Sequence, residues 1–389
     1  MKRVGVIGGG QLAWMMADAA QKLGVELVIQ TPSEHDPAVS IAQEIVFAPV
    51  DDASATEILA KKCDVITFEN EFVNLQALSL LAQEGVCFRP KLEALAPLLD
   101  KYHQRCYLSD LGLPVPQFFA LDQTENLKSK IEYLGFPAVL KSRRHGYDGQ
   151  GTFIIQDFAT LEQKLTLNQS LFLLEEFVPF ERELAIIAAR SVEGEIVTYP
   201  VVETQQEQQV CRRVIAPAQI TPNQVAEIQA IAHTLLNSLE VVGIFGIELF
   251  IRADGKVLVN EIAPRTHNSG HFSLDACETS QFEQHLRAVC GLPLGNPALQ
   301  CAGAVMVNLL GYENSHSDYQ SQRQKIAEIP QAHVHWYGKT ESRTGRKLGH
   351  VTVLLDNQNQ ELGSAITLGV GAAIANDIAH SIESIWYPR

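Results

Sequence analysis

Two apolar runs, each interrupted by a single glutamate, constrain the fold of this chain most strongly. The runs at 244–251 and 256–262 predict two strands, and Asp254-Gly255 between them is typical of a tight hairpin turn. Antiparallel pairing would set Glu248 and Glu261 beside each other on one face of the sheet. Two buried carboxylates that lie so close repel each other, and one of them would be protonated unless a cation lies between them.

A bound divalent cation would remove this repulsion. Mg²⁺ takes hard oxygen ligands from carboxylates, phosphates and water, and Asn260 offers a further neutral oxygen beside Glu261. The alternative is an incidental pair of acids, which is less common because unpaired glutamates are seldom buried. We therefore predict Glu248 and Glu261 as magnesium ligands.

Around this hairpin the chain divides into three regions, as expected for 389 residues at about 100 to 200 residues per domain. Alternating β-rich runs and helical patterns predict a parallel α/β domain over 1–100, and strand-loop-strand patterns with one long helix fill 101–290. A smaller β-rich region is expected over 291–389. The expected strands outside the hairpin lie at 3–7, 25–30, 64–68, 86–88, 136–141, 152–155, 171–177, 302–309, 332–337 and 350–355, and the expected helices include 11–23 and 222–240.

Charge and composition exclude several classes of protein. The formal net charge of −15 disfavours a nucleic-acid surface, which needs clustered Lys and Arg. The apolar run at the N-terminus is short and breaks into glycines, so we expect no signal peptide and no membrane anchor, and we predict a cytoplasmic protein. Seven scattered cysteines without a CxxC spacing predict free thiols that are mostly buried.

Two glycine-rich loops are candidate anion sites. The first, 8–12, lies between a strand and a helix, so its N–H groups could bind a phosphate or a carboxylate. A site for NAD or FAD would need an acidic residue at the end of the next strand to bind a ribose, and none stands there. The alternative to an anion site is that these glycines serve only a tight turn. The second loop, 144–151, follows Lys141 and suits a polyphosphate, although it lacks the end of a Walker loop and a flexible hairpin is an equal alternative. Lys101 and Lys141 are candidate phosphate ligands.

Acidic residues mark the end of another predicted strand. Glu175 and Glu176 end an apolar strand that runs into a hinge, and Glu183 follows shortly afterwards. An adenine could pack against apolar walls there and bond to the backbone, while a carboxylate accepts hydrogen bonds from ribose hydroxyls. The alternative is a solvated pair of acids at a strand end.

Two further segments are rich in hydrogen-bond donors. The segment 260–271 contains Arg265 and two histidines, lacks the spacing of a zinc site, and suits the orientation of an anionic substrate beside the metal; a purely structural loop is the alternative. Near the C-terminus, basic residues gather in an otherwise acidic protein, either as a phosphate pocket or as an exposed charged loop. These basic residues are Lys339, Arg343, Arg346 and Lys347.

Together these segments resemble one family, the 5-(carboxyamino)imidazole ribonucleotide synthases among the ATP-grasp enzymes of purine biosynthesis. The resemblance spans essentially the whole chain and is most specific over 260–271. It rests on Gly8-Gly9-Gly10-Gln11-Leu12, on Gly146-Tyr147-Asp148-Gly149 after Lys141, on Asn260-Glu261 with Ala263-Pro264-Arg265 and His267-Asn268-Ser269-Gly270-His271, and on His335-Trp336-Tyr337 with Gly345-Arg346-Lys347-Leu348-Gly349-His350.

The resemblance implies an α/β and α+β architecture, with an ATP-grasp fold between an N-terminal parallel α/β domain and a small C-terminal β-rich domain. It implies ATP and Mg²⁺ as cofactors. The implied reaction converts 5-aminoimidazole ribonucleotide, bicarbonate and ATP into 5-(carboxyamino)imidazole ribonucleotide through carboxyphosphate, in de novo purine biosynthesis. It also implies a homodimer, and it leaves open a transient contact with the downstream carboxyaminoimidazole ribonucleotide mutase.

Site residues carry over from the family by position. The ATP-binding residues would be Lys101, Lys141, Gly146, Tyr147, Asp148, Gly149, Gln150, Gly151, Glu175, Glu176, Phe177, Val178, Glu183, Asn260 and Glu261. The catalytic residues would be Glu69, Tyr147, Asp148, Arg265, His267 and Asn268. The ribonucleotide would bind Gly10, Gln11, Leu12, Lys339, Arg346 and Lys347, and the metal would bind Glu248 and Glu261.

The chain departs from the family pattern at three places, and two other readings compete. Ala13 and Trp14 replace the usual small and basic pair, which would alter helix packing more than phosphate binding. Gln150 stands where many relatives have a basic residue, and Gln205-Gln206 stands where relatives tend to have a histidine, so we assign no site at the latter. One competitor is another ATP-grasp ligase, such as a formate-dependent glycinamide ribonucleotide transformylase or a biotin carboxylase relative. The other is a non-catalytic nucleotide-binding module. The segments 335–337 and 345–350 favour the synthase family over other ligases.

Overall fold

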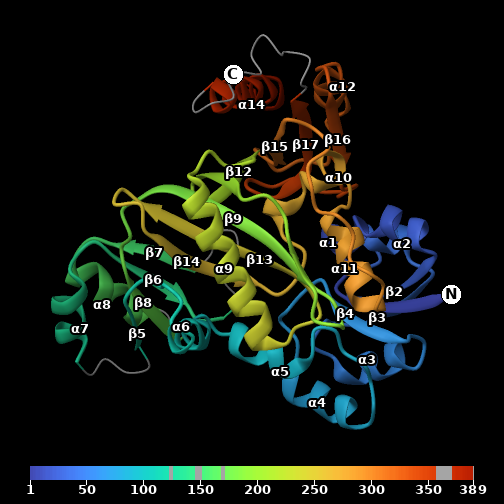
Figure 1. Cartoon of the computed structure of the whole chain (residues 1–389), viewed down its shortest axis with the longest axis horizontal. Coiled ribbons are helices and arrows are strands. Elements are labelled where there is room, and N and C mark those ends of the chain that lie inside the picture. Colours follow the sequence, from blue (N-terminus) through green and yellow to red (C-terminus); the bar gives the residue numbers. More distant parts are fainter. Residues whose placement is uncertain (122–125, 145–150, 168–170, 356–369, 389) are drawn as a thin grey trace.

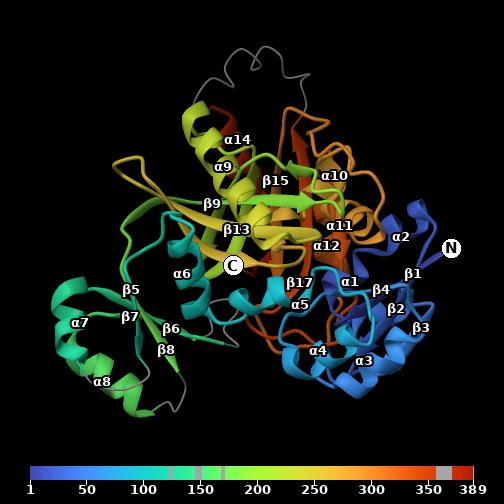
Figure 2. The same cartoon turned by 60° about the horizontal axis from the view of Figure 1, so that its bottom comes forward.

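Three sheets make up the computed structural model, which describes residues 1–121, 126–144, 151–167, 171–355 and 370–388. Figure 1 shows a small sheet with its helices at the left, the N-terminal sheet at the right and the largest sheet between and above them. The same division holds in the turned view of Figure 2. Among the described residues, no helix is both long enough and apolar enough to cross a membrane.

The N-terminal sheet is parallel, with strand order β3-β2-β1-β4. The predicted strands at 3–7, 25–30 and 64–68 are confirmed, whereas 86–88 is wrong as a strand because Phe88 makes only an isolated bridge to Ile66. The predicted helix at 11–23 is interrupted, since Met16 N–H bonds to Ala13 O in a tighter turn. The elements are β1 (Lys2–Ile7), α1 (Gln11–Trp14), α2 (Ala17–Leu23), β2 (Val25–Thr31), η1 (Pro37–Ile41), β3 (Glu44–Phe47), α3 (Ala53–Ala60), β4 (Val65–Phe68), α4 (Leu75–Gln83), α5 (Leu92–Leu95) and η2 (Ala96–Leu98).

The small sheet is antiparallel, with order β5-β8-β6-β7, and two helices pack against it. The predicted strands are confirmed to within two residues. β6 begins at Ala138 because the preceding Pro137 has no N–H to donate. The elements of this region are α6 (Lys101–Asp110), β5 (Phe118–Leu121), α7 (Leu127–Leu134), β6 (Ala138–Ser142), β7 (Thr152–Ile155), α8 (Phe158–Leu167) and β8 (Phe172–Glu176).

The largest sheet has nine strands, eight of them in the order β14-β13-β9-β11-β12-β15-β17-β16, with β10 paired to β9. The predicted hairpin is β13 and β14, and the predicted long helix is α9, which begins with a capping box formed by Thr221 and Gln224. The elements are β9 (Phe180–Arg190), β10 (Ile196–Thr198), β11 (Val202–Glu207), β12 (Val210–Ala216), α9 (Pro222–Leu239), β13 (Gly243–Arg252) and β14 (Val257–Ala263).

The last third of the chain extends this same sheet, because β15 pairs with β12 across the predicted boundary at 290. The predicted strands are confirmed, and the domain boundaries at 100 and 290 stay predictions. Helix α14 was not predicted, although Ala375, Ala379, Ile382 and Trp386 bury one face at helical spacing. The elements are η3 (Asn268–Gly270), α10 (Ser273–Ala276), α11 (Gln281–Cys290), β15 (Gly303–Leu310), α12 (Gln320–Ala327), β16 (Ala332–Trp336), β17 (Lys347–Leu355) and α14 (Val370–Trp386).

Helix α11 joins the N-terminal sheet to the largest sheet. Its residues Phe282, Leu286 and Val289 pack into the core of the N-terminal sheet, and the same helix contacts β13 and β9 of the largest sheet. All seven cysteines lie among the described residues and none forms a disulfide, which confirms free thiols. Only Cys277 and Cys290 are fully buried, so the prediction that most of them are buried is wrong.

Candidate active site

A cavity of about 920 Å³ lies where the three sheets meet. Its walls come from segments far apart in the sequence, among them the loops after β1 and β4, the ends of β6 and β8, and one face of β9, β11, β13 and β14. A cavity of this size, with polar groups converging on it, is typical of a site for a small-molecule ligand.

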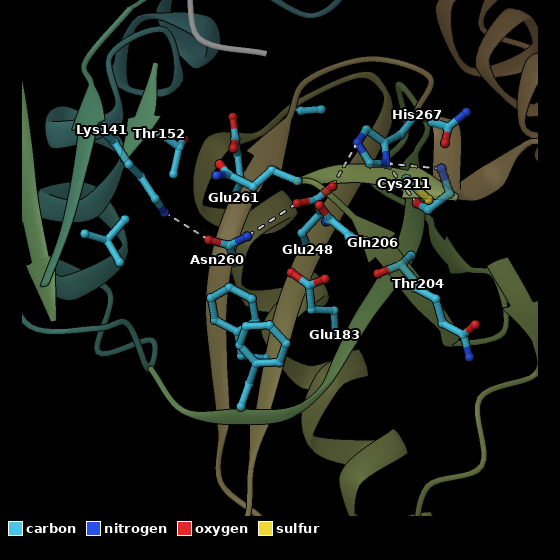
Figure 3. Close-up of a pocket in the computed structure, with 18 of the residues that line it drawn as sticks. Lys141, Thr152, Glu183, Thr204, Gln206, Cys211, Glu248, Asn260, Glu261 and His267 are labelled. Atoms are coloured by element: carbon cyan, nitrogen blue, oxygen red, sulfur yellow. Dashed lines mark hydrogen bonds and ion pairs between the residues drawn. The ribbon is translucent and has the colours of Figure 1, made fainter. Parts of the chain in front are cut away.

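Glu248 and Glu261 lie directly opposite each other in the β13–β14 pair and face this cavity (Figure 3). A β-bulge at this point changes the usual alternation of side chains. Val259 and Ile262 both pack in the core beneath α9, so the two residues between them, Asn260 and Glu261, both face the cavity. The bulge therefore adds an amide to the pair of carboxylates, as Mg²⁺ coordination by oxygen would require.

The charge repulsion expected for these acids is present. Burial, followed by the charge of Glu261, raises the pKa of Glu248 to about 7. Burial and the charge of Glu248 likewise raise the pKa of Glu183, on the neighbouring strand β9, to about 7. Burial also raises the pKa of Glu261, but an ion pair with Lys101 outweighs it, so that its pKa is lowered. This set of hard oxygen donors with excess negative charge fits a divalent cation.

The two predicted phosphate ligands, Lys101 and Lys141, face the same acids. Lys141 Nζ lies 3.1 Å from Asn260 Oδ1 and 2.7 Å from Glu175 Oε2. Glu175 is buried and also pairs with Arg105. Burial raises the pKa of Glu175, yet the charges of Arg105 and Lys141 lower it to about 2 overall. The Glu175 side chain therefore holds the lysine in place, and only its backbone is left for a ligand.

The hinge predicted to hold adenine lines the cavity. Glu176, Phe177 and Val178 connect β8 to β9 along one wall. Sequence reasoning missed Phe180 and Phe250, whose rings stack with centroids 4.6 Å apart on the same wall. Two signals in the sequence could have found them. Phe180 stands two residues after Val178 of the hinge, and Phe250 stands two residues after Glu248 and therefore on the same face of β13.

The first glycine loop holds a carboxylate, but this carboxylate belongs to Glu69 of the same chain. A Cβ atom at Gly10 would lie 2.4 Å from Glu69 Oε1, and Gly8, at φ +113°, would place one 2.3 Å from Oε2. Burial raises the pKa of Glu69, against the lowering effects of the Arg265 charge and of the N–H groups of Gly10 and Leu12. Gly10, Gln11 and Leu12 are thus brought next to Glu69, as the predicted site requires.

Arg265 and His267 are also brought to the cavity. Arg265 forms two hydrogen bonds with Glu71, at 2.6 and 3.0 Å, and Glu71 was missed although it stands two residues after Glu69. His267 Nε2 lies 3.4 Å from Glu248 Oε1. Asn268 also lines the cavity, but its amide exchanges two hydrogen bonds with Asn308, at 2.9 and 2.8 Å.

Basic residues of the C-terminal region reach the N-terminal loop. Lys339 Nζ donates to Gln11 Oε1 at 2.5 Å and to the carbonyl of Lys347 at 2.7 Å, and Lys347 itself lines the cavity. Arg346 instead donates to the carbonyl of Glu341 at 2.9 Å. Three of the predicted phosphate contacts, Gln11, Lys339 and Lys347, are thus neighbours.

Other predicted and missed residues complete the site. Gly146, Tyr147, Asp148, Gly149 and Gln150 lie outside the described residues. Gly151 directly precedes β7, and its carbonyl accepts from Ser142 N–H at 2.7 Å. Thr204 and Cys211 were missed, and Gln206, at the place where relatives tend to have a histidine, was assigned no site; all three line the cavity from β11 and β12 (Figure 3). The pairing of β11 with β9 and of β12 with β11 brings them there, and no local pattern in the sequence marks Thr204 or Cys211.

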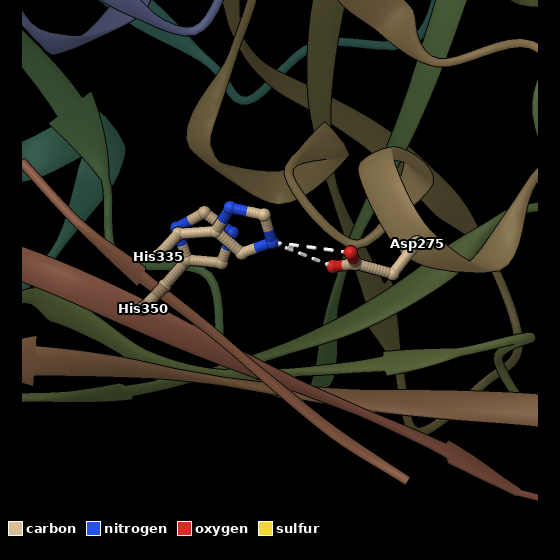
Figure 4. A group of neighbouring side chains, drawn as sticks. All are labelled: Asp275, His335 and His350. Carbon is tan, nitrogen blue, oxygen red and sulfur yellow. Dashed lines mark hydrogen bonds and ion pairs between the residues drawn. The ribbon is translucent and has the colours of Figure 1, made fainter. Parts of the chain in front are cut away.

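A second polar cluster, Asp275, His335 and His350, offers ligand atoms within 4.8 Å of one another (Figure 4). The two rings are stacked, with centroids 4.5 Å apart and planes at 13°. The nitrogen lone pairs of two stacked rings lie in separate parallel planes, so they do not converge on one point as the ligands of a metal do. His335 Nε2 lies 2.9 Å from Asp275 Oδ2, and His350 Nδ1 lies 2.8 Å from the Tyr337 hydroxyl. The cluster is therefore built as a hydrogen bond between His335 and Asp275 with the ring of His350 stacked on His335.

Comparisons with known proteins cover the chain from end to end. Three family models match: the ribonucleotide synthetase preATP-grasp domain over residues 1–97, the ATP-grasp domain over 106–282 and the phosphoribosylaminoimidazole carboxylase C-terminal domain over 304–362. An N5-carboxyaminoimidazole ribonucleotide synthase of Synechococcus elongatus is 54% identical over 387 residues, which are 99% of this chain and 96% of that relative.

Solved structures show the same fold. An ADP complex of an N5-carboxyaminoimidazole ribonucleotide synthetase is 35% identical, covers 99% of this chain and 97% of its own, and has a TM-score of 0.88. An Aspergillus clavatus N5-carboxyaminoimidazole synthase, in complex with ADP and 5-aminoimidazole ribonucleotide, is 29% identical, covers 98% and 99%, and has a TM-score of 0.86. The predicted fold class is confirmed, and the chain belongs to the N5-carboxyaminoimidazole ribonucleotide synthase family of ATP-grasp ligases.

Proposed function

We propose that this chain carboxylates 5-aminoimidazole ribonucleotide with bicarbonate at the expense of ATP, giving 5-(carboxyamino)imidazole ribonucleotide in purine biosynthesis. The observation that carries the proposal is the meeting of two sets of residues in one cavity. One set consists of the acids around Glu248 with Lys141, and the other of Glu69, Arg265, Gln11 and Lys347. Lys101 pairs with Glu261 of the first set. The first suits a magnesium nucleotide, and the second suits a phosphorylated amine.

At the nucleotide end, the hinge after β8 and the stacked Phe180 and Phe250 would hold adenine, and Glu183 the ribose. Lys101 would exchange Glu261 for phosphate oxygens, and Lys141, which stays paired with Glu175, would direct its remaining N–H donors to them. Glu248, Glu261 and Asn260 would hold Mg²⁺, which when bound offsets phosphate charge and favours transfer of the γ-phosphoryl group.

At the substrate end, Gln11, Lys339 and Lys347 would bind the phosphate of the ribonucleotide. Glu69 and Arg265 would orient the aminoimidazole and bicarbonate, so that the amine meets carboxyphosphate, or carbon dioxide released from it, away from water. Phosphate leaves carboxyphosphate as the nitrogen–carbon bond forms or when carbon dioxide is released. The amine loses a proton in the same step, and His267, which also lines the cavity, would accept it. These roles rest on the placement of the side chains and on the family pattern.

The decisive experiment measures phosphate release from ATP and bicarbonate with and without 5-aminoimidazole ribonucleotide. We expect strong stimulation by the ribonucleotide, abolished in Glu261→Gln. Formate with glycinamide ribonucleotide, and biotin, serve as substrates for the competing ligase classes. Stimulation by one of these instead, or none in the parent, would refute the substrate assignment. The homodimer, the contact with the mutase and the cytoplasmic location stay predictions from the sequence.

A further inference from the structure

The backbone of His267 is held by a side chain rather than by a neighbouring strand. His267 lies just after the end of β14, and its N–H donates to Gln281 Oε1 at 2.9 Å. The His267 carbonyl accepts from Gln281 Nε2 at 2.8 Å. A carboxamide that bonds both groups of one residue replaces the pair of hydrogen bonds that a β-strand would make.

The same carboxamide also fixes a second histidine. Because Oε1 faces an N–H donor and one hydrogen of Nε2 faces a carbonyl, the orientation of the Gln281 amide is set. Its other Nε2 hydrogen then donates to His271 Nδ1 at 3.0 Å. His271 must accept there, so its ring is neutral with the proton on Nε2, and burial lowers its pKa well below the usual range.

The surrounding chain is shaped around this arrangement. A Cβ atom at Gly270 would lie 2.6 Å from Gln281 Oε1, and one at Gly246 would lie 2.5 Å from the Cβ of His267. Gln281 and His271 have no exposed surface, so water does not compete for their hydrogen bonds. Glycine at these two positions leaves room for the Gln281 amide and for the His267 side chain, which any larger residue there would displace.

The position of Gln281 ties the site to the packing of the sheets. Gln281 is the first residue of α11, and its N–H donates to Ser273 Oγ at 2.9 Å. Helix α11 packs against the N-terminal sheet and against β13 and β9. His267 is thereby held relative to both ends of the cavity, with Nδ1 2.8 Å from Ser269 Oγ and Nε2 3.4 Å from Glu248 Oε1.

We infer that Gln281 is a positioning residue of the active site. Through its two bonds to the His267 backbone, which also fix the orientation of its amide, it sets the His267 imidazole against Glu248. The part of this inference that concerns turnover rests on the proposed function; the part that concerns the placement of His267 does not.

Helix α11 offers a matched control. One turn along the helix, the buried amide of Gln284 makes the same kind of pair with one backbone, accepting from Gly295 N–H and donating to Gly295 O, both at 2.8 Å. Gln281→Met and Gln284→Met therefore each remove one pair of bonds between an amide and a backbone from the same helix, and Gln281→Met also removes the bond to His271. Only the first touches His267.

The test compares these two variants in the full-length enzyme. In Gln281→Met we expect kcat for phosphate release driven by 5-aminoimidazole ribonucleotide to fall about tenfold to a hundredfold, with the KM for ATP nearly unchanged. The His267 imidazole signal in NMR, assigned by its loss in His267→Gln, should shift. In Gln284→Met, kcat and the His267 signal should both match those of the parent. Equal kcat losses in the two variants, or an unshifted His267 signal in Gln281→Met, would overturn the inference.

Gln281→Glu covers the case in which Gln281→Met fails to fold. The carboxylate keeps an acceptor for His267 N–H and loses the donors, but its protonated form regains one donor. Its kcat, relative to that of the parent, should therefore rise as the pH is lowered, and a flat ratio would contradict the role of the donor. If the parent shows no turnover with 5-aminoimidazole ribonucleotide, the proposed function fails, and the His267 signal still decides the placement.

Discussion

The two faces of the β9–β13–β14 sheet carry opposite kinds of side chain. Towards α9, Phe245, Ile247 and Leu249 of β13 pack in a fully apolar core. Towards the cavity, Glu248 of the same strand meets Glu183 and Glu261. One face thus stabilises the fold by burial, while the other keeps carboxylates at a cost in stability. Neighbouring residues in one strand should consequently respond to substitution with opposite signs.

Glu248→Gln tests the cavity face and should have the largest effect. It keeps the shape of the side chain and removes the charge, so turnover should fall on the order of a thousandfold, as for a lost electrostatic contact to a reacting phosphate. The free enzyme should become more stable, because a buried carboxylate beside Glu261 is gone. Phosphate release and thermal unfolding without nucleotide measure the two effects. A lower melting temperature would contradict the account of the acids.

Leu249→Ala tests the opposite face, one residue along. Leu249 is fully buried beneath α9, and its loss should destabilise the protein by about 2–5 kcal/mol. Urea unfolding measures this change. Turnover per folded molecule at low temperature should stay close to that of the parent, since the cavity face is untouched. A drop in turnover comparable to that of Glu248→Gln would mean that the two faces are not independent.

Deletion of Asn260 tests the bulge that departs from the alternation. With Val259 and Ile262 facing α9, removal of the extra residue leaves a regular hairpin in which Glu261 still faces the cavity. We expect a folded protein with turnover lowered about tenfold to a hundredfold, as Asn260 and its bond to Lys141 are lost. Circular dichroism and phosphate release measure this, with Asn260→Ala as the control that keeps the bulge. An unfolded deletion would show that the bulge is needed for folding.

The hairpin itself was predictable, whereas the bulge was not. Alternating apolar residues and the Asp254-Gly255 turn are local signals, and they placed Glu248 opposite Glu261 correctly. Whether an extra residue at 260 bulges depends on which neighbours pack beneath α9, and that is a property of the folded core. The same limit applies to Gln281, whose role depends on a contact with His267 fourteen positions away in the sequence, and to Thr204, which reaches the cavity only through strand pairing.

The pH dependence of stability also distinguishes the two faces of the sheet, and we expect it to be the smallest of these effects. Burial, the largest cause, and neighbouring charge raise the folded-state pKa of both Glu248 and Glu183 to about 7, against 4.5 as the ordinary value. Between these values the folded protein binds more protons than the unfolded chain, so the stabilisation present below about 4.5 is lost as the pH rises through 7. The melting temperature of the free enzyme should therefore fall between pH 5 and pH 8 by more in the parent than in Glu248→Gln. In Leu249→Ala the melting temperature should change with pH as it does in the parent, because the apolar face carries no titrating group. Equal changes in the parent and in Glu248→Gln would contradict this account, because the Glu248 carboxylate would then be ionised throughout this range.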